Sequence, residues 1–150
     1  MTGPEKALHH VSNALVAGTG VVYAWMLYLL TPEDAFALVN HPWQPELQSL
    51  HILFAPLLVF AVGFSWQNHV WMRLRFGFPH KRRTGLAMLA LFLPMVGSGY
   101  GLQVAVDDSF RTAWLWTHLV SSGLWVLVYI VHRLLPGPNL DEPPVFPDDE

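Results

Sequence analysis

The chain has 150 residues, of which 53% are hydrophobic and 13% carry a charge. Soluble domains average about 25% charged residues, so this composition indicates one small membrane domain. Cysteine is absent, which excludes a disulfide framework, a covalently attached c-type haem and a Cys-ligated iron–sulfur cluster on this chain. The net charge of −3 says little as a sum, because the charges are sorted by region.

The first uncharged run spans Leu8 to Leu30 and has 23 residues, whereas a membrane-spanning helix needs about 20. A cleavable signal peptide is the alternative, because the Ala-Phe-Ala triplet at 35–37 looks like a cleavage site. However, the run exceeds the usual apolar region of about 7–15 residues in such peptides, so we expect a retained helix. The connection at 31–46 has no Lys or Arg and should lie on the far side of the membrane.

The second run, 47–72, contains Pro56 and has His51 and His69 near its two ends. Proline is tolerated in membrane helices and is expected to kink this one. All of the next five cations fall within 73–83, the only basic cluster of the chain. The positive-inside rule predicts that this cluster is cytoplasmic, together with both termini if four spans exist. Beside a membrane helix it should contact lipid headgroups, and we expect no nucleic acid partner.

The third run, 84–106, contains Pro94 and a glycine-rich series, and the fourth run extends from residue 112 to about 134. The Pro-rich, acidic segment 136–150 has too little hydrophobic content to pack alone. We therefore predict an all-α integral membrane protein, with a four-helix bundle within residues 1–135, a separate tail, and both termini in the cytoplasm. The predicted helices cover about residues 8–30, 47–72, 84–106 and 112–134.

The fourth run carries two histidines, His118 and His132, which are 14 residues apart. Since this separation is close to four helical turns, both imidazoles leave the same face of one helix, about 21 Å apart. An ionisable side chain inside a membrane helix is costly and usually marks a functional site. The spacing suits two stacked haems, each of which would take one of these histidines as an axial ligand.

The second axial ligand of each haem should be a histidine at the same depth in the membrane as His118 or His132. His51 lies four residues into the second run and His118 lies six into the fourth. Both helices run inwards, so these two imidazoles should lie at matching depth near the far side. On the cytoplasmic side, the candidate partners of His132 are His9, His10 and His69.

Helix length separates these candidates. His69 lies 18 residues beyond His51, or about 27 Å, which is about one turn deeper than His132. Helix one is therefore the better match. His10 is favoured over His9 because small residues follow it on the same helical face, where they would leave room for a porphyrin, but all three candidates stay open.

Other residues could contribute to the same sites. Gly97 and Gly99 in the third run would give clearance to the far-side haem, although small residues in membrane spans also serve helix packing. Arg111 at the far rim could pair with a haem propionate, with simple snorkelling as the alternative.

The histidine pattern resembles that of the dihaem cytochrome b membrane subunits of respiratory formate dehydrogenases and nickel–iron hydrogenases, a cytochrome b561-like family. The resemblance covers about residues 9–133. It rests on His10 with Asn13 after it, His51, His118, His132 and the Thr19-Gly20 pair. The chain departs from the family at Val11, where a Trp commonly stands, and in its very short loops.

The resemblance implies two b haems held by His51 with His118 and by His10 with His132, and it places Gly20 at a haem site. It also implies electron transfer across the bilayer between an extracytoplasmic redox subunit and a quinone near the cytoplasmic haem. His69 is then a candidate for proton exchange with the quinone. Such a chain would be a multi-pass protein of the bacterial inner membrane and an electron-transfer subunit of an oxidoreductase complex, not a stand-alone enzyme.

Two other classes of function fit the same residues. A haem-free membrane anchor or assembly subunit would use the histidines as polar contacts between helices. A transporter-like protein would use them to conduct protons.

Overall fold

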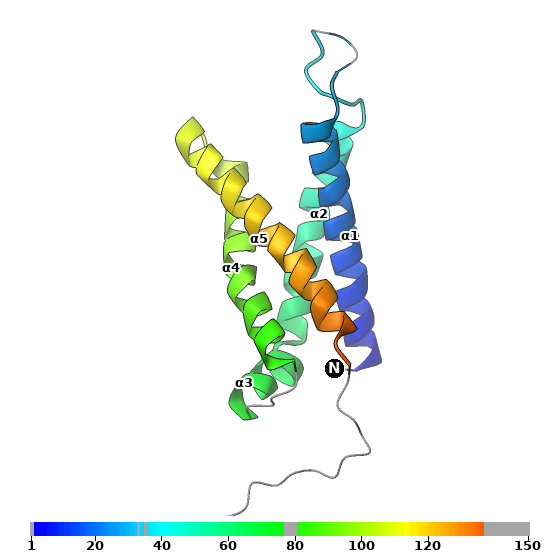
Figure 1. Ribbon diagram of the computed structural model, residues 1–150, viewed down its shortest axis with the longest axis vertical. Coiled ribbons are helices and arrows are strands. Elements are labelled where there is room, and N and C mark those ends of the chain that lie inside the picture. The colour runs from blue at the N-terminus through cyan, green and yellow to red at the C-terminus, as the bar shows by residue number, and fades with distance from the viewer. Residues whose placement is uncertain (1, 33, 35, 77–80, 137–150) are drawn as a thin grey trace, which may run out of the picture. The chain divides into compact units, whose positions relative to one another are not determined.

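The computed structural model describes residues 2–32, 34, 36–76 and 81–136. Within these residues it contains helices and no strand, and four helices are long and apolar enough to cross a membrane. This confirms the all-helical class, and each of the four predicted spans overlaps one of these helices (Figure 1). The segments are α1 (Gly3–Leu29), α2 (Gln44–Phe64), the π-helix η1 (Trp66–Trp71), α3 (Met72–Phe76), α4 (Arg82–Val104) and α5 (Asp108–Leu134).

The chain divides into two compact units, Met1–Phe76 and Gly77–Glu150. In the first unit α1 packs against α2, and in the second α4 packs against α5, so each unit is built on a hairpin of two long helices (Figure 1). The predicted tail lies outside the described residues from residue 137 on, as does the 77–80 part of the basic segment.

Helix α1 begins five residues before the predicted start, because a capping box forms at its N-terminus. The Glu5 backbone N–H donates to Thr2 Oγ1 at 3.4 Å, and the Thr2 N–H donates to Glu5 Oε2 at 2.6 Å. These bonds satisfy donors that the first turn would leave without partners. The other carboxylate oxygen of Glu5 accepts from Asn68 Nδ2 at 3.1 Å, which ties the start of α1 to η1.

The second predicted helix, 47–72, is two segments in the structure. Helix α2 already begins at Gln44 and ends at Phe64, and the π-helix η1 follows after Ser65. Short π-helical turns are rare and are often found at functional sites. His69 lies in η1, beyond the span, so the α-helical rise of 1.5 Å per residue does not apply along the whole distance from His51.

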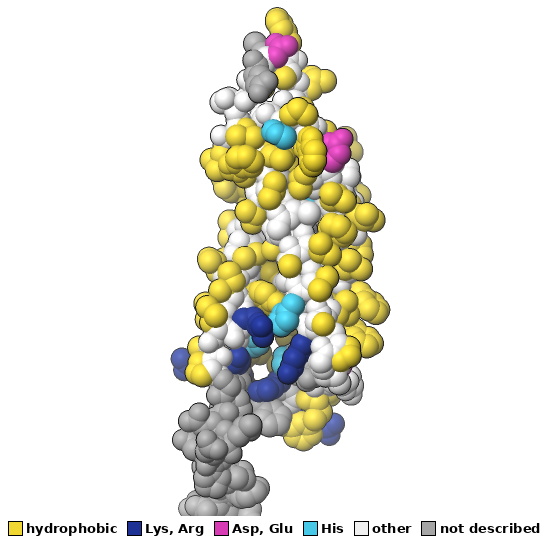
Figure 2. Space-filling view, turned by 90° about the vertical axis from the view of Figure 1, so that its right-hand side faces the viewer, with side chains coloured by type: hydrophobic (Ala, Val, Ile, Leu, Met, Phe, Trp, Pro, Cys, Tyr) yellow, Lys and Arg dark blue, Asp and Glu magenta, His cyan; other side chains and the backbone are white. Residues whose placement is uncertain are grey.

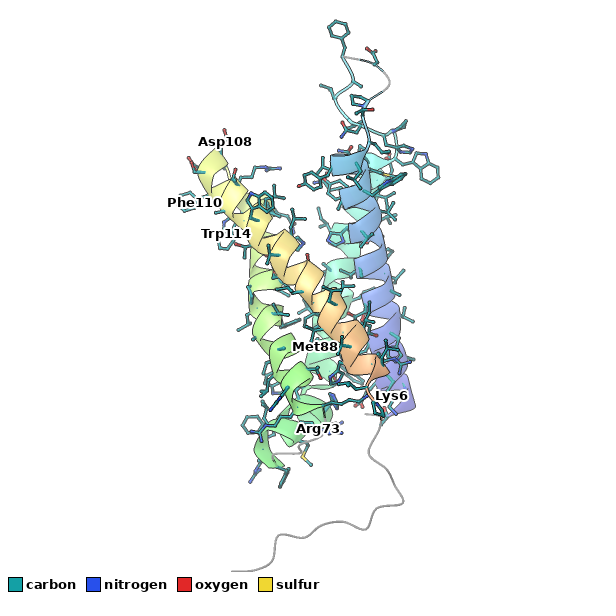
Figure 3. The ribbon with its side chains drawn as sticks, viewed as in Figure 1. Lys6, Arg73, Met88, Asp108, Phe110 and Trp114 are labelled. Atoms are coloured by element: carbon teal, nitrogen blue, oxygen red, sulfur yellow. The ribbon has the colours of Figure 1, made fainter. Side chains whose placement is uncertain are left out.

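Helix α5 begins at Asp108, four residues before the predicted start, because Asp107 caps it. Its Oδ1 accepts from the backbone N–H groups of Ser109 and Phe110 at 2.9 and 3.1 Å, which is the usual N-cap arrangement. Phe110 and Trp114 follow in the first turns of α5 (Figure 3). A Cβ at Gly101 would lie 2.7 Å from the Trp114 ring, so α4 needs a glycine where this ring of α5 packs against it.

The helices expose large apolar side chains and bury small polar ones. Phe60, Leu93 and Val120 expose between 57% and 73% of their surface, whereas Ser65 and Ser98 expose 1% or less. Hydrophobic side chains are spread along most of the length of the face seen in Figure 2. A bilayer favours this distribution, because lipid solvates apolar surface and leaves polar groups to bond within the protein.

Candidate functional site

His51 lies on α2, and its imidazole packs against α1. The ring Nδ1 is 3.0 Å from the carbonyl oxygen of Val16 and 3.3 Å from Oγ1 of Thr19. A Cβ at Gly20 would lie only 2.8 Å from His51 Cε1, so the ring occupies space that any larger residue would fill. Val16, Thr19 and Gly20 therefore form a fitted seat for the imidazole, which we call the Thr19 socket.

His118 lies on α5 and is held by α4 in the same way. Its Nδ1 is 3.1 Å from the Met95 carbonyl oxygen and 3.3 Å from Ser98 Oγ. A Cβ at Gly99 would lie 3.3 Å from His118 Cε1. We call Met95, Ser98 and Gly99 the Ser98 socket. In both sockets the residue that supplies the carbonyl comes three positions before the hydroxyl residue, and the glycine comes directly after the hydroxyl residue.

His132, near the end of α5, contacts a third hydroxyl–glycine step on α4. Its Nδ1 is 2.8 Å from Thr84 Oγ1. A Cβ at Gly85 would meet His132 Cε1 at 3.9 Å, which is an ordinary contact distance. The Thr84 socket, made of Thr84 and Gly85, is therefore looser at its glycine than the other two.

The hydrogen-bond partners fix which ring nitrogen carries the proton. In the first two sockets a backbone carbonyl can only accept, so Nδ1 of His51 and His118 must donate. In the third, the Thr84 hydroxyl donates to the Lys81 carbonyl at 3.0 Å and lies 2.8 Å from His132 Nδ1, an arrangement in which the hydroxyl oxygen accepts from the ring. All three rings thus carry their lone pair on Nε2. Metal-ligating imidazoles are commonly held in this form, with the other nitrogen donating to a fixed acceptor.

His9 is held in the opposite form. Its Nε2 is 2.7 Å from Ser65 Oγ, and the Ser65 hydroxyl donates to the Ala61 carbonyl at 3.1 Å. With its proton on the Ala61 carbonyl, Ser65 accepts from His9, and this arrangement places the His9 proton on Nε2. This contact joins the N-terminal part of α1 to the end of α2, so His9 serves helix packing.

The remaining predicted residues are distributed differently. His10 on α1 and His69 in η1 are half-buried, and Arg111 is exposed in the first turn of α5. Gly97 has open space where its Cβ would lie, unlike Gly99. The sequence interpretation missed Ser98 and the Thr84-Gly85 step, for which the only sequence signal is a hydroxyl residue directly before a glycine.

A haem needs fewer ligands from the protein than a bare metal ion does. Among the described residues, no group of three or more His, Cys, Asp or Glu side chains could hold a metal ion. A b haem brings four porphyrin nitrogens and asks the protein only for axial ligands. Oriented imidazoles against glycine surfaces meet that need.

No known protein family, curated protein or solved structure matches this chain. The resemblance to dihaem cytochrome b subunits therefore stays a prediction from the residue pattern.

Proposed function

We propose that the chain is a membrane dihaem b-type cytochrome that transfers electrons across the bilayer between a quinone and an extracytoplasmic redox partner. The observation that carries the proposal is the likeness of the seats of His51 and His118. Each ring is held by a carbonyl, a hydroxyl and a glycine of the neighbouring helix. One bis-histidine haem requires two such ligands with Nε2 as the coordinating nitrogen.

The second haem would be ligated by His132 and His10. His132 has its lone pair on Nε2, as the first two histidines do. His10 is preferred to its neighbour because the bond from His9 to Ser65 commits His9 to the other tautomer. His69, in the π-helix beyond the span, is reserved for proton exchange with the quinone.

The bound haems would supply iron centres that take up and release one electron at a time. The residues of the chain would hold and orient them. Gly20 and Gly99 admit the axial imidazoles close to the helix backbone, and the open surface at Gly97 would give clearance to a porphyrin edge. Arg111 would pair with a propionate at the far rim, and the apolar helices would keep water from the iron.

The proposed setting is the bacterial inner membrane, with four spans. The basic segment 73–83 and both termini would be cytoplasmic by the positive-inside rule. The connection between α1 and α2, which has no Lys or Arg between residues 31 and 43, would then face the redox partner.

The deciding experiment is an absorption spectrum of the protein purified from cells with an ample haem supply. A reduced-minus-oxidised spectrum with a sharp b-type α band, and a haem content near two per chain, supports the proposal. A folded, helical protein without that band would refute it and favour the anchor or the proton-conducting alternative.

A further inference from the structure

The three sockets share a feature that the proposed function does not require. In each, the hydroxyl donates its single proton within its own helix. Thr19 donates to the Leu15 carbonyl at 2.6 Å, Ser98 to the Pro94 carbonyl, and Thr84 to the Lys81 carbonyl at 3.0 Å. With that proton bonded within its own helix, each hydroxyl oxygen accepts from the imidazole Nδ1 that faces it.

The hydroxyl therefore stabilises only the tautomer that has its proton on Nδ1. An imidazole that flipped its tautomer would bring a bare Nδ1 lone pair against oxygen lone pairs. In the Thr19 and Ser98 sockets the carbonyl adds a second acceptor, at 3.0 and 3.1 Å. Strong acceptors at Nδ1–H also raise the basicity of the coordinating nitrogen and so favour the higher oxidation state of a bound metal.

We propose that the hydroxyls are positioning residues, which hold the imidazoles as Nδ1–H tautomers and set the electron-donating strength of Nε2. The pairs are Thr19 with His51, Ser98 with His118, and Thr84 with His132. The effect on the iron rests on the proposed function, whereas the tautomers belong to the protein alone. Removing a hydroxyl should shift the midpoint potential of the haem it serves to more positive values and leave the other haem unchanged.

The first test uses haem-free protein in lipid nanodiscs, labelled with ¹⁵N-histidine. Nitrogen chemical shifts distinguish the two tautomers. The expected result is Nδ1–H for His51, His118 and His132, and Nε2–H for His9. An Nε2–H tautomer at His51, His118 or His132 in the unsubstituted protein would overturn the proposal.

The second test is a redox titration of the haem-loaded protein. Thr19→Val and Ser98→Ala should move the potential of the same haem, Thr84→Val should move only the other one, and Thr19→Ser should restore the original value. Thr117→Val is the matched control, because Thr117 makes the same bond within its helix, to Ala113 at 2.8 Å, and is exposed.

The outcomes separate the two proposals. If the unsubstituted protein has no haem band, the cytochrome function fails and the tautomer measurement alone decides the positioning role. If two haems bind but Thr19→Val and Ser98→Ala shift their potentials no more than Thr117→Val does, the positioning role is wrong and the cytochrome function stands. If Thr19→Val does not fold, the comparison of Ser98→Ala with Ser98→Thr decides the question in the same way.

Discussion

Replacing Gly20 with alanine tests the seat of His51 directly. The new methyl carbon would lie 2.8 Å from Cε1 and 3.1 Å from Nδ1 of the imidazole. Non-bonded carbons rest about 3.5–4.0 Å apart, so the ring must retreat by about 1 Å. Its Nδ1 is now 3.0 Å from the Val16 oxygen, and a retreat of that size stretches the bond beyond the hydrogen-bond range of about 3.2 Å.

The fold should survive this change. Overpacking costs about 1–3 kcal/mol, and alanine returns about 1 kcal/mol of helix propensity. The histidine can also swing away, since its side chain has two rotatable bonds. Ligation should not survive, because an axial nitrogen displaced by about 1 Å cannot stay on the iron. We expect haem content to fall from two per chain towards one, measured from the reduced-minus-oxidised spectrum against protein concentration.

Gly63→Ala is the matched control for this prediction. Gly63 lies on α2, the helix that carries His51, gains helix propensity in the same way, and has nothing within 4 Å of the position of its Cβ. It should keep both haems. Full haem content with an unchanged α band in Gly20→Ala, or equal loss in the two variants, would refute the reasoning.

Three further predictions concern ligand pairing and topology. His51→Ala and His118→Ala should each remove the same haem, and loss of spectroscopically different haems would show that the pairing by depth is wrong. His69→Ala should keep both haems but slow their reduction by quinone, whereas His10→Ala should lose one haem. If spectra instead show haem loss in His69→Ala and not in His10→Ala, the axial ligand of the second haem lies in η1. A reporter enzyme that works only outside the cytoplasm should be active when it is fused at Pro45. An inactive fusion at this position would contradict the four-span topology.

The four long apolar helices could be predicted because a membrane-spanning helix needs about 20 residues without charge, and such runs can be read directly from the sequence. Their ends could not be predicted equally well. Thr2 and Asp107 extend α1 and α5 towards their N-termini through local hydrogen bonds, which hydropathy does not register. The change to a π-helix after Ser65 also leaves the hydropathy profile unaltered.

The histidines became candidate site residues from the sequence because an ionisable residue inside an apolar run is unusual. Their sockets could not, since the facing of a hydroxyl and a ring depends on the register between two helices. Thr84-Gly85 contacts an imidazole, whereas Ser122-Gly123 has the same kind of sequence and open space beside its glycine. Gly20 entered the prediction only through the family resemblance.

The bond between His9 and Ser65 has a consequence for the rotation of α1 about its own axis. Successive residues of an α-helix point about 100° apart, so neighbouring side chains cannot face the same direction. The 2.7 Å contact between His9 Nε2 and Ser65 Oγ fixes which side of α1 faces the end of α2. The direction in which His10 leaves the helix is thereby set. His9 thus acts as the angular reference for His10 beside it.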